Sequence, residues 1–235
     1  MKPVSCDSTL LLIRGFDIFE HITDEEYKEL DLVHNYIEAK KGGYIYFSHQ
    51  NHNKLFFAKK GFIKIGYIDE NGNEIIKEII QKGEVFGQFT LEKDNGKDEF
   101  ARAYKSDVSL CAFNIDDFKK LLRTKPEMAI KFSTLLGNKL KKTETRLVNL
   151  LNKDVKTRLI NLLLQLAAES PRKQPDKISF EKYLTHEDMA RLIGSSRQTV
   201  TTILNLLEEA QLIETGKKEI IIKDIGALEK LDFVL

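Results

Sequence analysis

Hydrophobic and polar residues alternate in short runs through the first half of the chain. β-rich runs separated by turn signals extend from Tyr44 to Phe113, among them YIYF, KLFF, FIKIGYI and EIIKEII. The last two flank Asn71-Gly72, a dipeptide that readily supplies the positive φ angles of a tight hairpin. Several short strands at close spacing predict a compact β sandwich or barrel.

Beyond Asp116 the pattern becomes helical, and Pro126 marks the start of a long segment that runs to about Asn152. Apolar or small residues recur in this segment with 4-3-4-3 spacing, at Leu136, Leu140, Thr143, Leu147 and Leu150. Such a narrow seam is typical of a two-stranded coiled coil. A helix laid on the β domain is the alternative, but charged residues on the other faces favour a dimer interface along this seam.

The last third predicts helices at Asp154–Glu169, Leu184–Ile193 and Ser196–Ala210, then a β pair around Thr215–Lys218. In the segment HEDMARLIGSSRQTVTTILN, small Ala190 allows two helices to approach and Gly194 makes the turn between them. Aliphatic residues at matching positions form the shared core, namely Met189, Ile193, Val200 and Ile203. This spacing predicts a helix-turn-helix.

With that core buried, the first two turns of the second helix present polar side chains outward. This is the part of a helix-turn-helix that enters a major groove. The GKKE turn that follows indicates a winged helix whose lysines contact phosphates. The predicted DNA-binding residues are Ser195, Ser196, Arg197, Gln198, Thr199, Thr201, Thr202, Lys217 and Lys218. The alternative is that the serines only cap the helix and that Arg197 and Gln198 are solvated.

Composition narrows the class of protein. With 235 residues, 42% hydrophobic and 31% charged, the chain predicts a globular protein of two domains. No apolar run approaches the roughly 18 residues of a membrane span, and the N-terminal pattern does not predict a signal peptide. The two cysteines, Cys6 and Cys111, are too few for a disulfide framework or a four-thiolate metal site. We therefore expect a cytoplasmic protein without a metal site, and the cofactor stays unknown.

Charge is distributed unevenly. The net charge of +1 divides into −6 over residues 1–118, +7 over 119–146, +1 over 147–153, from Lys153, and −1 over 154–235. A nearly neutral C-terminal third is weak evidence for a nucleic-acid binder, so a ligand-sensing β dimer or scaffold without DNA binding stays open. The sequence contains no glycine-rich phosphate loop, no His/Cys metal spacing and no nucleophile elbow. We therefore do not expect an enzyme.

The segment LTHEDMARLIGSSRQTVTTILNLLEEAQLIE resembles the helix-turn-helix of the CRP/FNR family of bacterial transcription regulators. DVKTRLINLLLQLA, DIFEHITDEE and YIDENGNEIIKEIIQKGEVFG extend the resemblance over nearly the whole chain. It implies an α+β protein with a jelly-roll-like β-roll (a double-stranded β-helix) in residues 1–118, a long dimerisation helix in 119–153 and a winged helix-turn-helix in 154–235. A homodimer would then bind a pseudo-palindromic double-stranded operator, with RNA polymerase as a further candidate partner.

The effector is where the sequence departs from the family. Members that bind cyclic AMP have Gly-Glu-Leu and Arg-Ser where this chain has Gly87-Gln88-Phe89 and DNGKDEFARAY, which offers only Lys97 and Arg102 as cations. Thr143 falls where those members use a threonine against the adenine. The candidate pocket is therefore Gly87, Gln88, Phe89, Arg102 and Thr143. We expect an effector other than cyclic AMP, or none.

Other sensing chemistries of the family also lack their residues. Oxygen-sensing members use a cluster of cysteines, which this chain does not have. Haem-binding members use histidine, but the five histidines are scattered and predict surface positions, at His21, His34, His49, His52 and His186. The sequence therefore leaves the effector unassigned.

Overall fold

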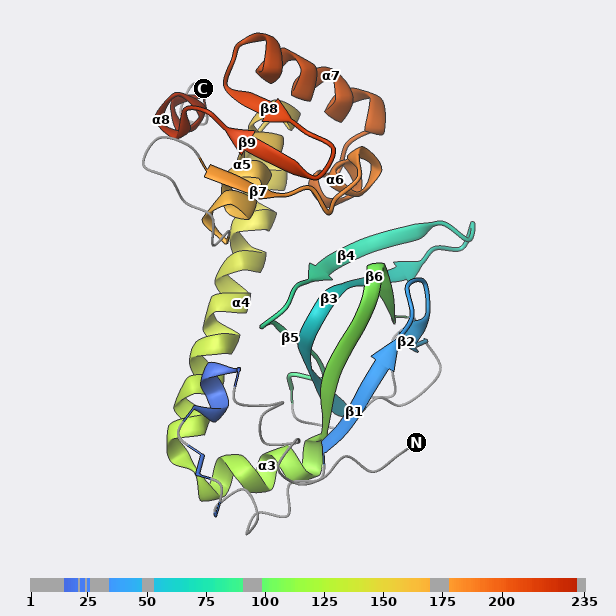
Figure 1. Ribbon diagram of the computed structural model, residues 1–235, viewed down its shortest axis with the longest axis vertical. Coiled ribbons are helices and arrows are strands. Elements are labelled where there is room, and N and C mark those ends of the chain that lie inside the picture. The colour runs from blue at the N-terminus through green and yellow to red at the C-terminus, as the bar shows by residue number, and fades with distance from the viewer. Residues whose placement is uncertain are drawn as a thin grey trace. The chain divides into compact units, whose positions relative to one another are not determined.

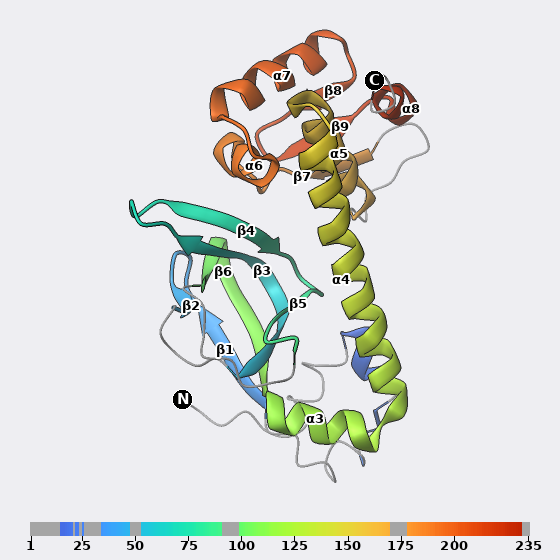
Figure 2. The ribbon, with the colours of Figure 1, turned by 180° about the vertical axis from the view of Figure 1, so that it is seen from behind.

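The structure is a computed structural model that describes residues 15–231, apart from residues 21, 24, 26–33, 48–52, 91–98 and 170–177. It comprises two compact units, residues 1–141 and 142–235 (Figures 1 and 2). Those bounds differ from the predicted three-part division, which the structure does not test. The first unit contains η1 (Asp17–Phe19), β1 (His34–Ala39), β2 (Tyr44–Tyr46), β3 (Lys54–Ile68), β4 (Glu74–Ile80), β5 (Val85–Gly87), β6 (Glu99–Asn114), α3 (Ile115–Thr124) and most of α4 (Pro126–Asn152).

The first unit is built on an antiparallel sheet in the order β1-β6-β3-β4, with β2 paired to β6 and β5 paired to β3. The long strands β3 and β6 pair along most of their length and curve together (Figure 1). An aromatic core packs between the sheet and the helices, formed by Phe16, Phe19, Phe57, Phe113, Phe118 and Phe132. A second buried cluster lies on the inner side of the strands, around Ile63, Ile65, Ile80 and Phe86.

The predicted hairpin is confirmed, with a different loop. β3 pairs with β4, and the Asp69 N–H donates to the Asn73 carbonyl at 2.9 Å. Only Gly72 takes a positive φ, of 80°, because the Asp69 carboxylate accepts the Asn71 and Asn73 N–H groups and closes a wider loop. A tight two-residue turn would have needed positive φ at Asn71 as well.

Two strand predictions need correction. KLFF and FIKIGYI, which read as separate strands, form the single strand β3, because Gly61 bends the strand at φ 81° without ending it. A Cβ atom at Gly61 would lie 2.6 Å from the Asp107 carbonyl oxygen, so only glycine fits this approach of β6. β1 has a mixed polar sequence without clear alternation and was not predicted; its partner β6 supplies the pairing.

Helix α4 begins at Pro126 and ends at Asn152, as the sequence predicts. Met128 and Phe132 pack its first two turns into the aromatic core. Farther along, several large apolar side chains of α4 are exposed, namely Ile130, Leu140, Leu147, Val148, Leu150 and Leu151. Within the described residues, no helix combines the length and the hydropathy that crossing a membrane requires.

The second unit contains the end of α4, then α5 (Val155–Ala168), β7 (Ile178–Glu181), α6 (His186–Ile193), α7 (Arg197–Glu209), β8 (Ile213–Thr215), β9 (Glu219–Ile222) and α8 (Ile225–Lys230). Its sheet has the order β7-β9-β8, so a third strand joins the predicted pair. α6 begins two residues later than predicted, because Thr185 and Asp188 form a capping box that leaves Leu184 outside the helix. The polar loop SPRKQPDK lies outside the described residues.

Candidate nucleic-acid interface and effector region

Two short helices meet at a glycine turn in the second unit. Gly194 has φ 65° and ψ 54°, the left-handed conformation that ends α6, and the Ser195 N–H donates back to the Ala190 carbonyl at 2.8 Å. Ala190 is buried, as are the four aliphatic residues predicted to join the helices, Met189, Ile193, Val200 and Ile203. The predicted helix-turn-helix core is therefore present.

The start of α7 divides into capping residues and unbonded donors. Ser196 accepts the Thr199 N–H at 3.1 Å, and the two hydroxyl groups lie 2.9 Å apart, so this pair stabilises the helix start. Ser195 is half-buried in the turn. Arg197 and Gln198 are exposed, and their side chains make no hydrogen bond to other described residues. Of the predicted readers, these two keep donors for a partner.

The two threonines predicted to project outward bond to their own helix. The Thr201 hydroxyl donates to the Arg197 carbonyl at 2.9 Å, and the Thr202 hydroxyl donates to the Gln198 carbonyl at 3.1 Å. Thr202 is exposed and Thr201 is half-buried. Thr201 also contacts His186 across the turn, a link that no sequence pattern indicated. Their hydroxyl protons are thus already used within the protein.

The wing is the β8–β9 hairpin, and the exposed Lys217 and Lys218 lie in its turn. Glu208 near the end of α7 holds the end of β8, since its carboxylate accepts the Thr215 hydroxyl and N–H, each at 2.6 Å. These bonds, the hydroxyl first, hold the pKa of Glu208 below its usual value. Helix and wing are therefore joined by a charged hydrogen-bond acceptor.

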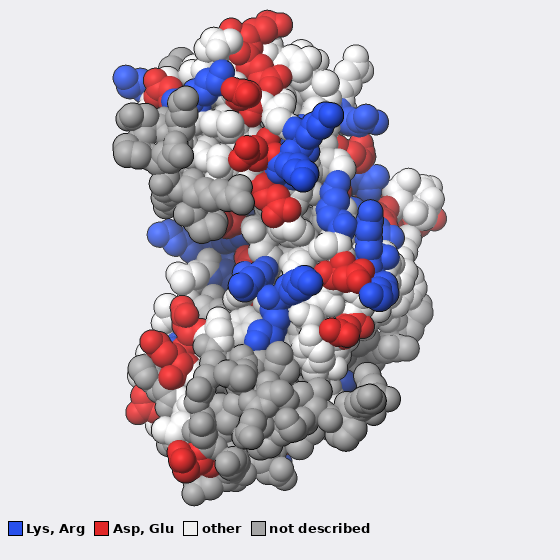
Figure 3. Space-filling view, viewed as in Figure 1, with Lys and Arg blue, Asp and Glu red and all other residues white. Residues whose placement is uncertain are grey.

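Charge alone would not identify this surface. Residues 154–235 contain 12 lysines and arginines against 13 aspartates and glutamates. Figure 3 shows both signs on the described surface of each unit in that view. Attraction for an anionic polymer therefore depends on where the cations lie, and Arg197, Lys217 and Lys218 are exposed at the helix start and in the wing.

The segment that matches the family's ribose site is tied to the roll. Gly87 has φ 104°, and a Cβ atom there would lie 2.5 Å from the Lys54 carbonyl oxygen, so packing requires this glycine. The Gln88 amide donates to the Thr90 hydroxyl at 2.7 Å. The Phe89 ring stacks on Phe132, with ring centroids 6.5 Å apart.

Arg102, another candidate pocket residue of the same unit, lies on a different part of the sheet. Arg102 pairs with Glu74 at 2.6 Å and is in register with Lys64, on the sheet face opposite the buried Ile63 and Ile65. Thr143 is exposed on the part of α4 that belongs to the second unit. Lys97 lies outside the described residues. The structure does not bring Arg102 together with Gly87–Phe89.

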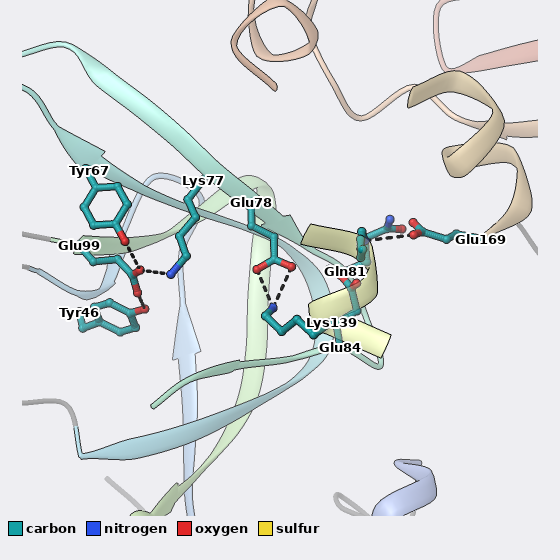
Figure 4. Close-up of polar contacts among 10 residues, drawn as sticks. Tyr46, Tyr67, Lys77, Glu78, Gln81, Glu84, Glu99, Lys139 and Glu169 are labelled. Atoms are coloured by element: carbon teal, nitrogen blue, oxygen red, sulfur yellow. Dashed lines mark hydrogen bonds and ion pairs between the residues drawn. The ribbon is translucent and has the colours of Figure 1, made fainter. Parts of the chain in front are cut away.

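Sequence reasoning missed a polar network on the inner face of the roll (Figure 4). Lys139 of α4 donates to both carboxylate oxygens of Glu78, at 2.7 and 2.8 Å, and its ammonium lies 5.0 Å from the Phe89 ring centroid. Glu99 accepts the Tyr46 hydroxyl at 2.7 Å and also pairs with Lys77. Burial, and then Glu99, raises the pKa of Tyr46, which stays protonated.

This network faces inward because of strand register. Glu78 pairs with Ile65, and Glu99 pairs with Tyr67, so both carboxylates lie on the face of the buried Ile63. A register shift in β4 leaves Lys77 as the extra residue beside Glu99. Of these residues, only Glu99 lies in DNGKDEFARAY, and its contacts with Tyr46 and Lys77 were not predicted.

Some of the predicted seam residues of α4 pack within their own unit, and others are exposed. Leu136 packs partly against the aromatic core of its own unit. Leu140 and Leu147 are 59% and 56% exposed, and Leu150 is 38% exposed. The structure adds three exposed apolar side chains on the same helix, Ile130, Val148 and Leu151. Several exposed apolar side chains along one helix are typical of an interaction surface.

The cysteines and histidines are the remaining candidate residues. Cys111 is buried in the core, which raises the pKa of its thiol to about 11, and Cys6 lies outside the described residues. Among the histidines, only the side chain of His186 is described. No three His, Cys, Asp or Glu side chains in the described part of the chain gather as a metal site.

Comparison with known proteins matches both units to known domain families. Residues 36–125 match the cyclic nucleotide-binding domain and residues 157–231 match the Crp-like helix-turn-helix domain. The chain is 30% identical over 194 residues to the global nitrogen regulator of Synechococcus elongatus, covering 82% of this chain and 87% of that one. It is 28% identical over 173 residues to the cAMP-activated global transcriptional regulator CRP of Salmonella typhimurium, covering 72% and 80%.

Solved structures agree with these matches. A CooA mutant from Carboxydothermus hydrogenoformans has a TM-score of 0.76 at 23% identity, over 94% of this chain and 95% of that one. A CRP/FNR transcriptional regulator from Thermus thermophilus has a TM-score of 0.65 at 24% identity, over 85% and 99%. The α+β fold of roll, long helix and winged helix-turn-helix is thus confirmed, and a DNA-free scaffold finds no support. The chain is a DNA-binding transcription regulator, not an enzyme, and belongs to the CRP/FNR family.

Proposed function

We propose that α7 reads the operator through Arg197 and Gln198 and that Lys217 and Lys218 of the wing contact phosphates. The observation that carries this assignment is the exposure of Arg197 and Gln198 at the start of α7, with side-chain donors that no other described residue uses. A guanidinium pairs with the two acceptors of guanine, and an amide pairs with an adenine edge. Ser195, Ser196, Thr199, Thr201 and Thr202 then support the reading surface.

Replacing Arg197 by alanine tests the assignment. We expect a loss of about 1–3 kcal/mol in binding free energy and a relaxed preference at one base pair. Affinity would be measured on a duplex that the wild-type protein selects from a random-sequence library, and on its single-base variants. Arg123→Ala removes an exposed arginine of α3 and serves as the matched control, with no expected change. An unchanged base preference in Arg197→Ala would refute α7 as the reader.

We further propose a parallel homodimer along α4, with Leu140, Leu147 and Leu150 in the seam and Thr143 as its polar position. The exposure of these leucines supports the proposal. Leu136 would contribute at the edge, since it also packs on its own core. A parallel pair of α4 helices would give two recognition helices spaced about 34 Å apart, to match successive major grooves of a pseudo-palindromic site.

The three-part division into residues 1–118, 119–153 and 154–235 belongs to the same proposal. Residue 118 falls within α3, so that boundary separates roles and not folded units. RNA polymerase is a further candidate partner, because regulators of this type act on transcription. Copurification of polymerase with the operator-bound dimer would test it.

We propose that cyclic AMP is not the effector of this protein, although one relative is activated by it. Removing a phosphate from water requires cations or converging N–H groups in its place. Arg102 is committed to Glu74 on the outer face, and the inner lysines Lys77 and Lys139 are held by Glu99 and Glu78. A phosphate would therefore have to displace a carboxylate that already satisfies its lysine.

Calorimetry with cyclic AMP and cyclic GMP on the purified dimer tests this exclusion. We expect no binding in the low micromolar range. Tight binding accompanied by stronger operator binding would show that a lysine leaves its carboxylate for the phosphate, and the exclusion would be wrong. A ligand with less negative charge, or no small-molecule effector, is the expected alternative.

A further inference from the structure

Arg158 of α5 bonds to the ends of two other helices of the second unit. Its Nη1 donates to the Lys153 carbonyl at 3.0 Å and to the Leu150 carbonyl at 3.4 Å. Its Nη2 donates to the Gly194 carbonyl at 3.3 Å. The first two acceptors lie at the end of α4 and directly after it, and the third lies in the turn between α6 and α7. One guanidinium therefore connects the end of the long helix to the helix-turn-helix.

The chemistry of helix ends explains why an arginine suits this position. The last four carbonyl groups of a helix have no N–H partner within that helix, and they carry partial negative charge. The Leu150 carbonyl is among the last four of α4, and Gly194 is the C-cap of α6. A guanidinium presents its donors in a planar fork, so its two Nη groups can bond to both helix ends in one geometry. The Nε group of Arg158 is buried and bonds to no other described residue, so the two Nη groups hold the head.

The same contacts span a connection of two residues. Residues 153 and 154 alone separate α4 from α5. The side chain of Leu150 also reaches the turn, because a Cβ atom on Gly194 would lie 3.3 Å from Leu150 Cδ2. Leu150, a residue of the proposed seam, thus meets the turn with its side chain and is bonded to Arg158 through its backbone.

We propose that Arg158 is a positioning residue that fixes the reading helix relative to the dimer seam, and so sets the spacing of half-sites that the dimer accepts. The seam residues Leu147 and Leu150 belong to the same compact unit as α7. A rigid joint between seam and reader holds the two readers of a dimer at one spacing, whereas a loose joint lets each reader follow its own half-site. The inference rests on the proposed α4 dimer and on the proposed role of α7 as the reader.

Operators with altered spacing test the joint. One base pair added or removed between the half-sites of the selected duplex rotates one half-site against the other by about 35°. The wild-type dimer should bind the selected duplex roughly 30-fold or more tightly than the two altered duplexes. In Arg158→Gln this preference should fall to about threefold, because the joint no longer holds the readers at one spacing. Affinity for a duplex with a single half-site should stay within about twofold of wild type, because α7 itself is unchanged.

Lys142→Gln is the matched control. Lys142 also links α4 to α5, through a partly exposed ion pair with Glu169 at 3.1 Å that does not reach the turn. Such a pair contributes little, so this variant should keep the wild-type spacing preference.

Three results would overturn the inference. Equal losses of Arg158→Gln on every duplex, the single half-site included, would mean a damaged reader. An unchanged spacing preference in Arg158→Gln would mean that other contacts fix the joint, and an equal loss of preference in Lys142→Gln would mean that any contact between α4 and α5 does so. If the wild-type dimer itself shows no spacing preference, the proposed pairing of two readers fails instead.

Discussion

The start of α7 and the inner face of the roll both gather polar side chains, and they treat them in opposite ways. At α7, Arg197 and Gln198 extend from a capped helix end and bond to no other described side chain. In the roll, Glu78 holds Lys139, and Glu99 holds Tyr46 and Lys77. The first surface leaves donors exposed for a partner, whereas the second satisfies its own charges.

This contrast shows which functional property of the family can be assigned to this chain and which cannot. A polar helix start with exposed donors is complementary to a patterned acceptor surface, and a DNA groove is one. A closed network must be opened before it can bind an ion, and its opening costs the bonds that are broken. DNA binding therefore follows from the family and agrees with the geometry, while the effector needs its own evidence.

The largest expected effect comes from the α4 seam, which joins the two copies of the chain in the proposed dimer. Leu140→Asp/Leu147→Asp places charges in the α4 seam and should give monomers that bind the operator roughly 100-fold or more weakly, because one half-site no longer helps the other. Analytical ultracentrifugation and operator titration measure both. Ile68→Asp/Ile75→Asp, on an exposed hairpin, is the control that should stay dimeric. A dimeric seam variant would refute this interface.

The polar network of the roll, which includes the Lys139–Glu78 pair, should give non-additive effects on the free energy of unfolding when its members are substituted. Lys139→Met or Glu78→Gln alone should lower the free energy of unfolding by about 1–3 kcal/mol, because each leaves a half-buried charge without its partner. The double variant should lose less than the sum of the two. Urea unfolding of the wild type, the two single variants and the double variant at pH 7 measures these free energies and completes the double-mutant cycle.

A more exposed ion pair provides the comparison for that cycle. Lys131 pairs with Glu20 at 2.7 Å, and the Glu20 side chain is 64% exposed. Lys131→Met should cost about 0–1 kcal/mol. Additive effects of Glu78→Gln and Lys139→Met would show that the two charges are independent, and the contrast with α7 would be lost.

The same two regions show how far sequence reasoning reaches. The helix-turn-helix follows from local rules, because Gly194 must take a left-handed conformation and small Ala190 must allow close approach. The hairpin at Gly72 and the bounds of α4 follow from equally local signals. These features were predicted because neighbours in the sequence decide them.

The inner network depends on register between distant strands, which periodicity does not reveal. Glu99 and Tyr46 are far apart in sequence and meet only because β2 and β6 pair with an irregularity between Tyr44 and Tyr46. Arg102 was a candidate anion ligand by sequence position, yet strand alternation turns it to the face of Lys64. Predicting either would have required the register in advance.

A smaller effect is expected at the wing. Lys217→Ala should weaken binding to all sequences alike and lower the slope of log affinity against log salt by about one, since one phosphate contact is lost. Titrations at several salt concentrations, on the selected duplex and on random duplexes, measure this change. A loss confined to the selected duplex would instead make Lys217 a base reader, and the contrast between reader and wing would have to be redrawn.

The smallest effect concerns the link from α7 to the wing. Glu208→Gln keeps an acceptor for Thr215 but removes the charge, so it should cost about 1 kcal/mol of unfolding free energy at pH 7. The folded pKa of Glu208 lies below its unfolded value, so its stabilisation is complete above the unfolded pKa and is lost as pH falls through the folded one. The difference between wild type and variant should therefore shrink as the pH is lowered toward 3 and Glu208 takes up a proton. Urea unfolding of the two proteins at pH 7 and pH 3 measures it, and a difference that does not depend on pH would mean that shape, and not charge, joins helix and wing.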